Sequence, residues 1–179
     1  MRKHALLVVA AVLVTANAVA QDEHEYKKKA PKVIHATETG PVTNLEAQAT
    51  FKRLGTVIKS VLHTGVPSWT EGTNKPASRF AVASYFLKMY RTLEPIMTVS
   101  PVAISVEVNR ISAPTKSQRD GIAYLVKKGF VGNFGPLATG KGSSLTVEQF
   151  GDAIGLFVSR LAENTHTPSS KWTPYLHGN

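Results

Sequence analysis

Basic residues gather around two loops of this chain, and anion binding is the chemistry that they could perform. Lys127 and Lys128 close a predicted helix, Lys141 lies in a Gly-rich loop, and Lys75 and Arg79 stand at the equivalent place in the first half. An Arg can hold a carboxylate or phosphate by a two-pronged contact, and a Lys by a point charge. With an aromatic ring that could stack on a sugar and a hydroxyl at a helix start, the candidate binding residues are Lys75, Arg79, Lys127, Lys128, Lys141, Trp69 and Thr146. Solvated charges and a core aromatic are the alternative interpretation.

Catalytic and metal-binding patterns do not emerge from the sequence. Glu148 and Asp152 are four residues apart on a predicted helix, which places both carboxylates on one face, yet a solvent-facing pair is the commoner arrangement. There is no nucleophile-elbow Ser pattern, and the chain has no Cys. The histidines beyond the N-terminal segment lack metal-ligand spacing: His24, His35, His63, His166 and His177. We therefore predict a non-catalytic protein with no metal and no cofactor.

The Gly-rich loop at residues 132–144 does not match a nucleotide-binding loop. A P-loop requires Gly, four residues, then Gly-Lys followed by Ser or Thr, and here Lys141 is followed by Gly142. This mismatch argues against nucleotide binding.

The charge balance favours anionic partners. The chain carries 21 Lys and Arg against 12 Asp and Glu, a net charge of +9. Removal of the first 20 residues would leave a net charge of about +7. An acidic cell-wall or envelope polymer, or an envelope protein, fits this balance, and nucleic acid is the less favoured partner. A basic surface with no specific partner fits it as well.

Four amphipathic helices are predicted, and they indicate a mainly α fold. In each, apolar residues recur at spacings of three and four, which gives one apolar stripe. Thr43 with Glu46, and Thr146 with Gln149, have capping-box spacing. The predicted helices run from Thr43 or Asn44 to Gly65, from Ser78 to Pro95, from Ser117 to Gly129, and from Thr146 through Leu161.

These helices form two packed helix-loop-helix hairpins, residues 45–95 and 117–163, within one domain at residues 45–163. Ile58 to Gly65 and Ile122 to Gly129 have the same separation, and a loop and a second helix follow each. Repetition has a physical reason, because one such hairpin cannot hide its apolar face alone. Alternatively, any two amphipathic hairpins look alike at this level.

Residues 102–108 connect the two halves with alternating apolar and polar side chains. This period of two is typical of a half-buried strand. A single strand needs a pairing partner, which the sequence does not identify. An extended connector that lies across the helices is the alternative.

The second half, residues 117–163, carries three short motifs in order: Gly129-Phe130-Val131-Gly132, Phe134-Gly135-Pro136 and residues 146–150. They resemble the Gly turn, the Phe-x-Pro element and the Thr-Arg-Ala-Glu helix start of an S-layer homology repeat. Val147 stands where the family has an Arg, and Gln149 where it has Glu. In the first half, Phe80 keeps the register. The resemblance implies a paired-repeat helical fold and binding of anionic cell-wall polysaccharide.

The two ends of the chain differ from the predicted domain. Residues 1–20 read as a secretory signal peptide, with Arg2 and Lys3 before a short apolar run, and an uncleaved anchor is the alternative. Residues 21–44 read as a flexible leader. Residues 164–179 read as a tail whose Trp172 and Tyr175 fold back onto the domain. We therefore expect an exported protein of the periplasm, cell surface or extracellular space, with no membrane span after cleavage.

Three functions remain open from the sequence. The first is a secreted, non-catalytic binding module for the cell envelope or surface. The second is a structural or assembly protein that binds other surface proteins, with oligomers among its forms. The third is a small exported hydrolase with an unrecognised site.

Overall fold

The computed structural model describes residues 40–98 and 110–172, and this part of the chain is mainly helical, as predicted. The helices, with two short 3-10 turns, are α2 (Asn44–Leu62), α3 (Arg79–Leu93), η2 (Glu94–Ile96), α4 (Lys116–Lys127), α5 (Pro136–Thr139), α6 (Val147–Asn164) and η4 (Ser169–Lys171). The four long helices correspond to the four predicted ones. The short helix α5, which begins with Pro136 in the Gly-rich loop, was not predicted.

Local capping decides where the long helices begin. In each, a hydroxyl just before the helix accepts a hydrogen bond from the backbone N–H three residues on: Thr43, Ser78, Thr115 and Thr146. The capping boxes of α2 and α6 are both complete, because the side chains of Glu46 and Gln149 accept from the backbone N–H groups of Thr43 and Thr146. The predicted start of α4 was two residues late, because Thr115 rather than Ser117 is the N-cap.

Left-handed residues follow three of the long helices, and one of them is His166 after α6, with a φ of 49°. Gly129 follows α4 with a φ of 78°, as predicted, because glycine adopts this region at little cost. The predicted end of the first helix at Gly65 is wrong. Helix α2 ends at Leu62, and His63 takes the left-handed position with a φ of 52°.

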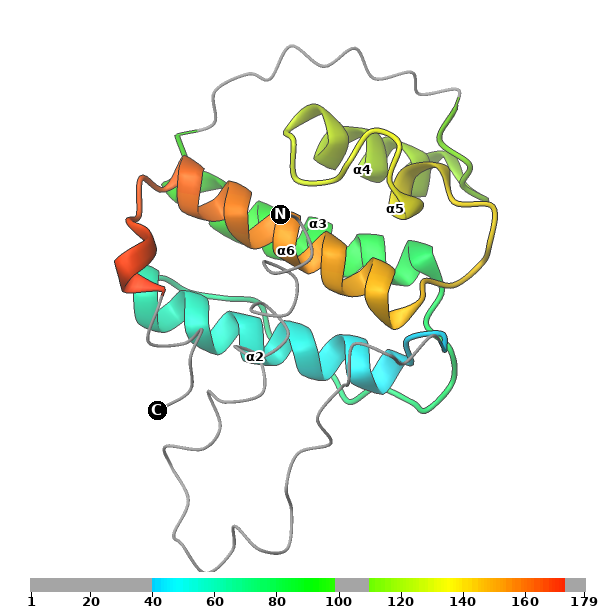
Figure 1. Ribbon diagram of the computed structural model, residues 1–179, viewed down its shortest axis with the longest axis horizontal. Coiled ribbons are helices and arrows are strands. Elements are labelled where there is room, and N and C mark those ends of the chain that lie inside the picture. The colour runs from blue at the N-terminus through cyan, green and yellow to red at the C-terminus, as the bar shows by residue number, and fades with distance from the viewer. Residues whose placement is uncertain (1–39, 99–109, 173–179) are drawn as a thin grey trace, which may run out of the picture.

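All four long helices run in the same direction (Figure 1). Antiparallel bridges join the segments 41–43, 76–78 and 144–146, which directly precede α2, α3 and α6. At the opposite end, Lys128 after α4 pairs with Glu94 after α3. The two helix-loop-helix halves are therefore present, but in each half the connection returns along the domain, so that both helices start at the same end.

Helix α3 lies at the centre of the core. It contacts α2, α4 and α5 directly. Ring contacts also join α3 to α2 and to α6. The ring centre of Phe86 lies 4.8 Å from that of Phe51 of α2 and 5.3 Å from that of Phe157 of α6. Phe130, after α4, lies 4.8 Å from Tyr90 of α3 and 5.1 Å from Phe157. These buried rings join both halves of the chain into one hydrophobic core.

The structure tests two predictions about the chain ends. The leader was predicted to reach Asn44, yet Val42 is buried, and its N–H donates to the carbonyl of Leu145 at 2.9 Å. The carbonyl of Val42 accepts from Ala77 N–H at 2.8 Å. Residues 41–43 are thus part of the fold. Trp172 is buried, which confirms that this part of the tail folds back.

Other predictions lie outside the described residues. These are the signal peptide at 1–20, the leader up to residue 39, the strand or connector at 102–108, and Tyr175. Within the described ranges, no helix has the length and apolar character to cross a membrane.

Candidate functional site

The starts of three helices meet at one end of the molecule. Asn44 N–H donates to the carbonyl of Lys75 at 2.9 Å, and Arg79 N–H donates to the carbonyl of Ser143 at 2.8 Å. The hydroxyl of Thr146 caps α6 at the same place. Thr146 therefore serves the fold through its side chain. We call this region the start face, defined by residues 41–43, 73–78 and 140–146.

Two of the predicted binding residues lie exposed on the start face. Lys75 directly precedes the bridged segment 76–78, and Lys141 precedes the segment 144–146. The N-terminus of a helix carries a partial positive charge of about half a unit, and three such ends lie here. Glu46 and Glu148 stand in the first turns of α2 and α6 at the same end, so their carboxylates offset part of the positive charge of the two ammonium groups and the helix ends.

Arg79 is also at the start face, but the structure places it inside. Its side chain is only 2% exposed. Nε donates to the carbonyl of Gly142 at 3.0 Å, Nη1 donates to that of Leu137 at 2.9 Å, and Nη2 donates to that of Ser112. The guanidinium also lies 4.2 Å from the centre of the Phe80 ring. Burial lowers the pKa of Arg79, although a guanidinium stays protonated at neutral pH. The prediction that Arg79 binds an anion is corrected, because its side chain is buried and its donors bind the carbonyls of Ser112, Leu137 and Gly142.

Lys127 and Lys128 lie at the opposite end from Lys75 and Lys141. Both stand at the C-terminal end of α4, and a helix of 12 residues spans about 18 Å. Lys128 Nζ lies 3.3 Å from Oε1 of Glu94. Lys127 is exposed. The predicted lysines therefore do not form a single site, and a shared contact of Lys141 with the other two requires a long polymer.

A polar cluster that the sequence analysis missed surrounds Glu94. Its Oε1 accepts from Tyr90 Oη at 3.4 Å and from Tyr124 Oη, besides its pairing with Lys128. The hydrogen bond from Tyr124, followed by the contacts with Lys128, lowers the pKa of Glu94. Burial and the Glu94 charge raise the pKa of Tyr90, and the bond to Glu94 raises that of Tyr124. This cluster joins the ends of α3 and α4 and is partly shielded from solvent.

The sequence carries only a partial signal for this cluster. Tyr90 and Glu94 are four residues apart, which places them on one helix face. Tyr124 lies 30 residues away from Glu94 along the chain, so no local pattern joins the two.

Trp69 packs along α2 and α3 rather than at the start face. Its ring centre lies 5.2 Å from that of Phe51 and 5.7 Å from that of Tyr85. Lys88 Nζ lies 5.0 Å from the ring centre, a cation–π contact. The indole Nε1 is buried without a hydrogen-bond partner. Stacking of Trp69 on a sugar stays a prediction, and the ring already has protein contacts.

The carboxylate pair Glu148 and Asp152 lies on the first turns of α6. Burial, followed by the Glu148 charge, raises the pKa of Asp152. No group of three or more His, Cys, Asp or Glu residues able to hold a metal ion occurs in residues 40–98 and 110–172.

The geometry defines a small, mainly α protein in which the starts of three helices and two exposed lysines lie at one end. Comparison of the chain with protein-family models, curated proteins and solved structures finds no match.

Proposed function

We propose that this protein is a non-catalytic binding module of the cell envelope or surface, and that it attaches to an anionic polymer through the start face. The observation that supports this function is the position of Lys75 and Lys141, which stand exposed on the two loops that lead into helix starts. Positive helix ends and two lysines attract carboxylate or phosphate groups together. Export to the envelope belongs to the same proposal and is motivated by residues 1–20.

The polymer is an acidic polysaccharide or a similar envelope polyanion. Such a ligand presents many charges along its length, so a broad positive face suits it better than a closed pocket. The net positive charge, about +7 after removal of residues 1–20, increases the rate of encounter with it. Trp69 and the pair Lys127 and Lys128 lie elsewhere and would contact only distant parts of a long chain.

Co-sedimentation of the purified protein with cell-wall or envelope fractions tests the proposal. We compare the parent with Lys75→Ala/Lys141→Ala at low and high salt. A lysine near an anionic surface contributes about 1 kcal/mol, so loss of two weakens binding roughly thirtyfold at low salt. High salt weakens binding of the parent because it screens exposed charges.

A matched control carries the same change in net charge at the opposite end. Lys59→Ala/Lys127→Ala removes two exposed lysines from the last turns of α2 and α4. This variant should bind like the parent. Equal losses in both double variants would show that only net charge matters, and no binding by the parent would refute the polymer-binding function.

A second candidate function, assembly with other protein chains, is supported by a different surface. Phe134 is 72% exposed and is the most exposed of the large apolar side chains in the described ranges. Single exposed apolar side chains are common on protein surfaces, so Phe134 is the position at which a substitution would first test this function.

A further inference from the structure

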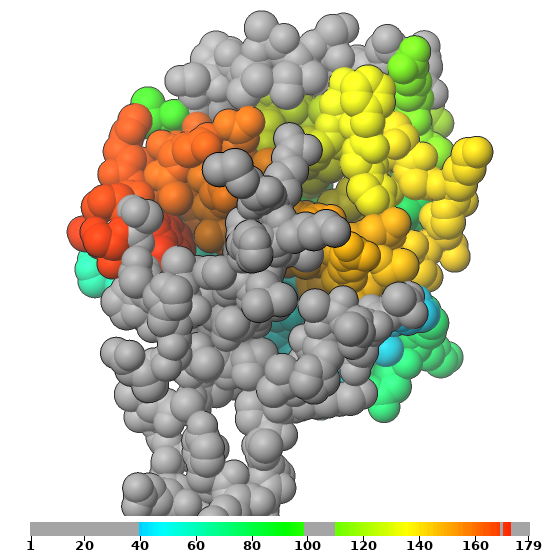
Figure 2. Space-filling model, in the orientation of Figure 1, coloured from blue at the N-terminus to red at the C-terminus, as the bar shows by residue number. Residues whose placement is uncertain are grey.

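The starts of α2, α3 and α6 repeat one local arrangement. In each, the first helical N–H donates to the carbonyl three residues before the cap of the next helix in the series, and the last returns to the first: Asn44 to Lys75 at 2.9 Å, Arg79 to Ser143 at 2.8 Å, and Val147 to Gly40 at 3.2 Å. The residues one position before each cap and 4, 8, 11 and 15 positions after it are buried in all three helices. The start face therefore contains three equivalent junctions, and Figure 2 shows the segments that lead into them together on the right of the molecule.

The side chain at the first helical position differs among the three junctions. At the α3–α6 junction, Arg79 is buried, and its donors already bind backbone carbonyls. At the α6–α2 junction, Val147 offers no polar group. At the α2–α3 junction, Asn44 is partly exposed, and its Nδ2 lies 3.5 Å from the carbonyl oxygen of Lys75, at the limit of a hydrogen bond. Of these three side chains, only that of Asn44 therefore offers polar atoms to a ligand.

Asn44 belongs to a group of four polar side chains beside α2 and α3, which we call the junction cluster: Asn44, Gln48, Thr70 and Tyr85. The phenol of Tyr85 donates to Asn44 Oδ1 at 3.4 Å, and it accepts from Gln48 Nε2 at 3.1 Å. The hydroxyl of Thr70 donates to Gln48 Oε1 at 3.4 Å. Hydroxyl donors ordinarily lie about 2.5 to 3.0 Å from an oxygen acceptor, so both hydroxyl bonds are weak and exchange readily for bonds to a ligand. Because all four residues are at least partly exposed, a ligand can reach these groups.

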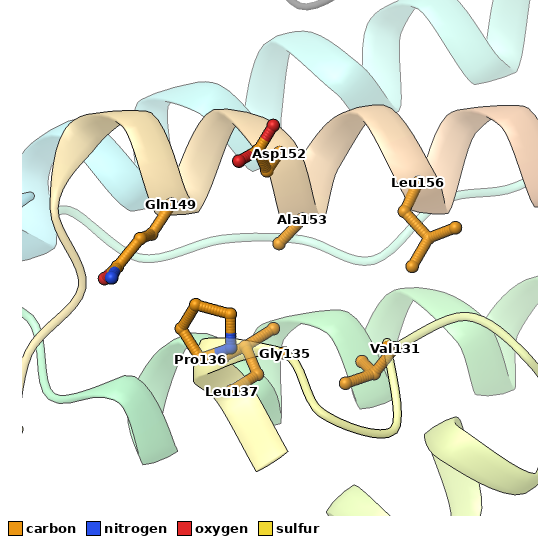
Figure 3. A pocket seen from close by; sticks show the side chains of 9 residues that line it. Val131, Gly135, Pro136, Leu137, Gln149, Asp152, Ala153 and Leu156 are labelled. Atoms are coloured by element: carbon orange, nitrogen blue, oxygen red, sulfur yellow. The ribbon is translucent and has the colours of Figure 1, made fainter. Parts of the chain in front are cut away.

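The groove beside Phe134, between α6 and the segment that leads into α5, differs in kind from this cluster. Ala153 and Leu156 of α6 face Val131 and Pro136 across it (Figure 3). Facing apolar side chains give a hydroxylated ligand no hydrogen bonds. The junction cluster, rather than this groove, therefore has the polar groups that orient a polysaccharide.

We propose that the junction cluster, with Lys75 next to it, binds one sugar residue of the anionic polymer. Amide and hydroxyl groups donate and accept hydrogen bonds, as the hydroxyl groups of a sugar do, so the two sets can pair with each other. The exposed ammonium group of Lys75 attracts the carboxylate or phosphate of the same sugar or of the next one. This inference rests on the proposed function and narrows its ligand to a glycan, because a polyanion without sugars would use the lysines alone.

Two model polyanions with one carboxylate per unit test this subsite: polygalacturonate, which is made of sugars, and polyglutamate, which is not. Biolayer interferometry with each immobilised polymer measures the affinity of the purified protein at low salt, and the parent should bind polygalacturonate more tightly. Gln48→Ala/Tyr85→Phe removes two groups of the cluster. We expect it to weaken binding of polygalacturonate about tenfold and to leave binding of polyglutamate unchanged. Lys75→Ala/Lys141→Ala should weaken binding of both polymers.

Thr92→Val is the matched control, because it removes an exposed hydroxyl nearer the C-terminal end of α3 and should change neither affinity. Circular dichroism verifies that each variant is folded. Tyr85→Phe alone repeats the test with the loss of a single hydroxyl group, which a folded helix tolerates.

Three results would overturn the subsite. They are a parent that does not prefer polygalacturonate, a preference that survives in Gln48→Ala/Tyr85→Phe, and an equal loss in Thr92→Val. A parent that gave any of these results but bound envelope fractions would leave the proposed function standing. A parent that bound neither polymer and no envelope fraction would remove both.

Discussion

Arg79 shows how a residue chosen for binding can serve the fold instead. Its three carbonyl partners belong to residues 33, 58 and 63 positions away along the chain. They lie before α4, in α5 and in the Gly-rich loop. One planar guanidinium offers five donors in fixed directions, which allows it to hold three separate segments at once. Arg79 thereby supports the loop that carries Lys141.

Replacement of Arg79 tests this internal role. Arg79→Met keeps much of the apolar stem but leaves three carbonyls without their charged donor. Hydrogen bonds to a charged group contribute more than neutral ones, and a buried group left unpaired costs about 1 to 3 kcal/mol. We expect a loss of about 3 kcal/mol in the free energy of unfolding, measured by urea denaturation.

Lys141→Ala is the control for this measurement. Lys141 is exposed on the loop that Arg79 holds, so its removal should change the free energy of unfolding by less than about 0.5 kcal/mol. An Arg79→Met protein that is as stable as the parent but does not bind the polymer would show instead that Arg79 contacts the ligand.

At the scale of elements, the helices differ in what fixes their two ends. Each start depends on a hydroxyl that accepts a hydrogen bond from the backbone N–H three residues further on, so it is a local feature of the sequence. The common end of α3 and α4 depends on the cluster around Glu94, whose members come from both helices. The sequence therefore predicts where these helices start, but it does not predict that the ends of α3 and α4 pack together.

The Glu94 cluster predicts a dependence of stability on acid. The pKa of Glu94 is lowered in the folded state, so its contribution to stability is complete above the ordinary carboxyl pKa and is lost as pH falls through the folded value. The difference in unfolding free energy between the parent and Glu94→Gln should therefore be largest near neutral pH and shrink below about pH 4.5. Urea denaturation at a series of pH values measures it.

The same cluster predicts how the stability of the folded state changes at alkaline pH. The pKa values of Tyr90 and Tyr124 are raised, so the neutral phenols stabilise the folded state below the ordinary Tyr pKa of about 10, and this contribution declines as pH rises beyond it. Glu148→Gln, a change at an exposed carboxylate outside the cluster, is the control. If Glu94→Gln and the control show the same pH profile, the cluster does not stabilise the folded state.

At the scale of the whole molecule, four parallel helices share one core, and three of them start at one face. Parallel helices place their dipoles side by side with like ends together, an arrangement that is unfavourable by itself. The buried aromatic rings and the bridges between helix starts hold it. The same arrangement places the starts of three helices on the face that we propose binds anions.

A shared core predicts that the two halves unfold together. Phe86 and Phe157 belong to different halves and are in contact, and Val42 bonds to Leu145 across the same division. We expect one cooperative thermal transition, with equal calorimetric and van't Hoff enthalpies. Two separate transitions, or a folded fragment of residues 40–98 alone, would show that the halves are independent.

The predictable part of this protein is the part encoded by near neighbours. Capping boxes, apolar spacings and the glycine after α4 act over three or four residues, so the sequence alone determined a mainly α chain with four helices in nearly the right places. The burial of Trp172 also followed, because a large aromatic in a tail has reason to pack.

Only the tertiary structure decided which ends of the helices meet. It separated Lys128 from Lys141, buried Arg79, and left Phe134 exposed beside a groove. Each of these outcomes depends on contacts between residues tens of positions apart, and such contacts form wherever the whole core packs best. A lysine or an arginine in a loop has the same local sequence pattern whether its side chain faces solvent or binds three carbonyls. Local spacing does not show which residues will cover it.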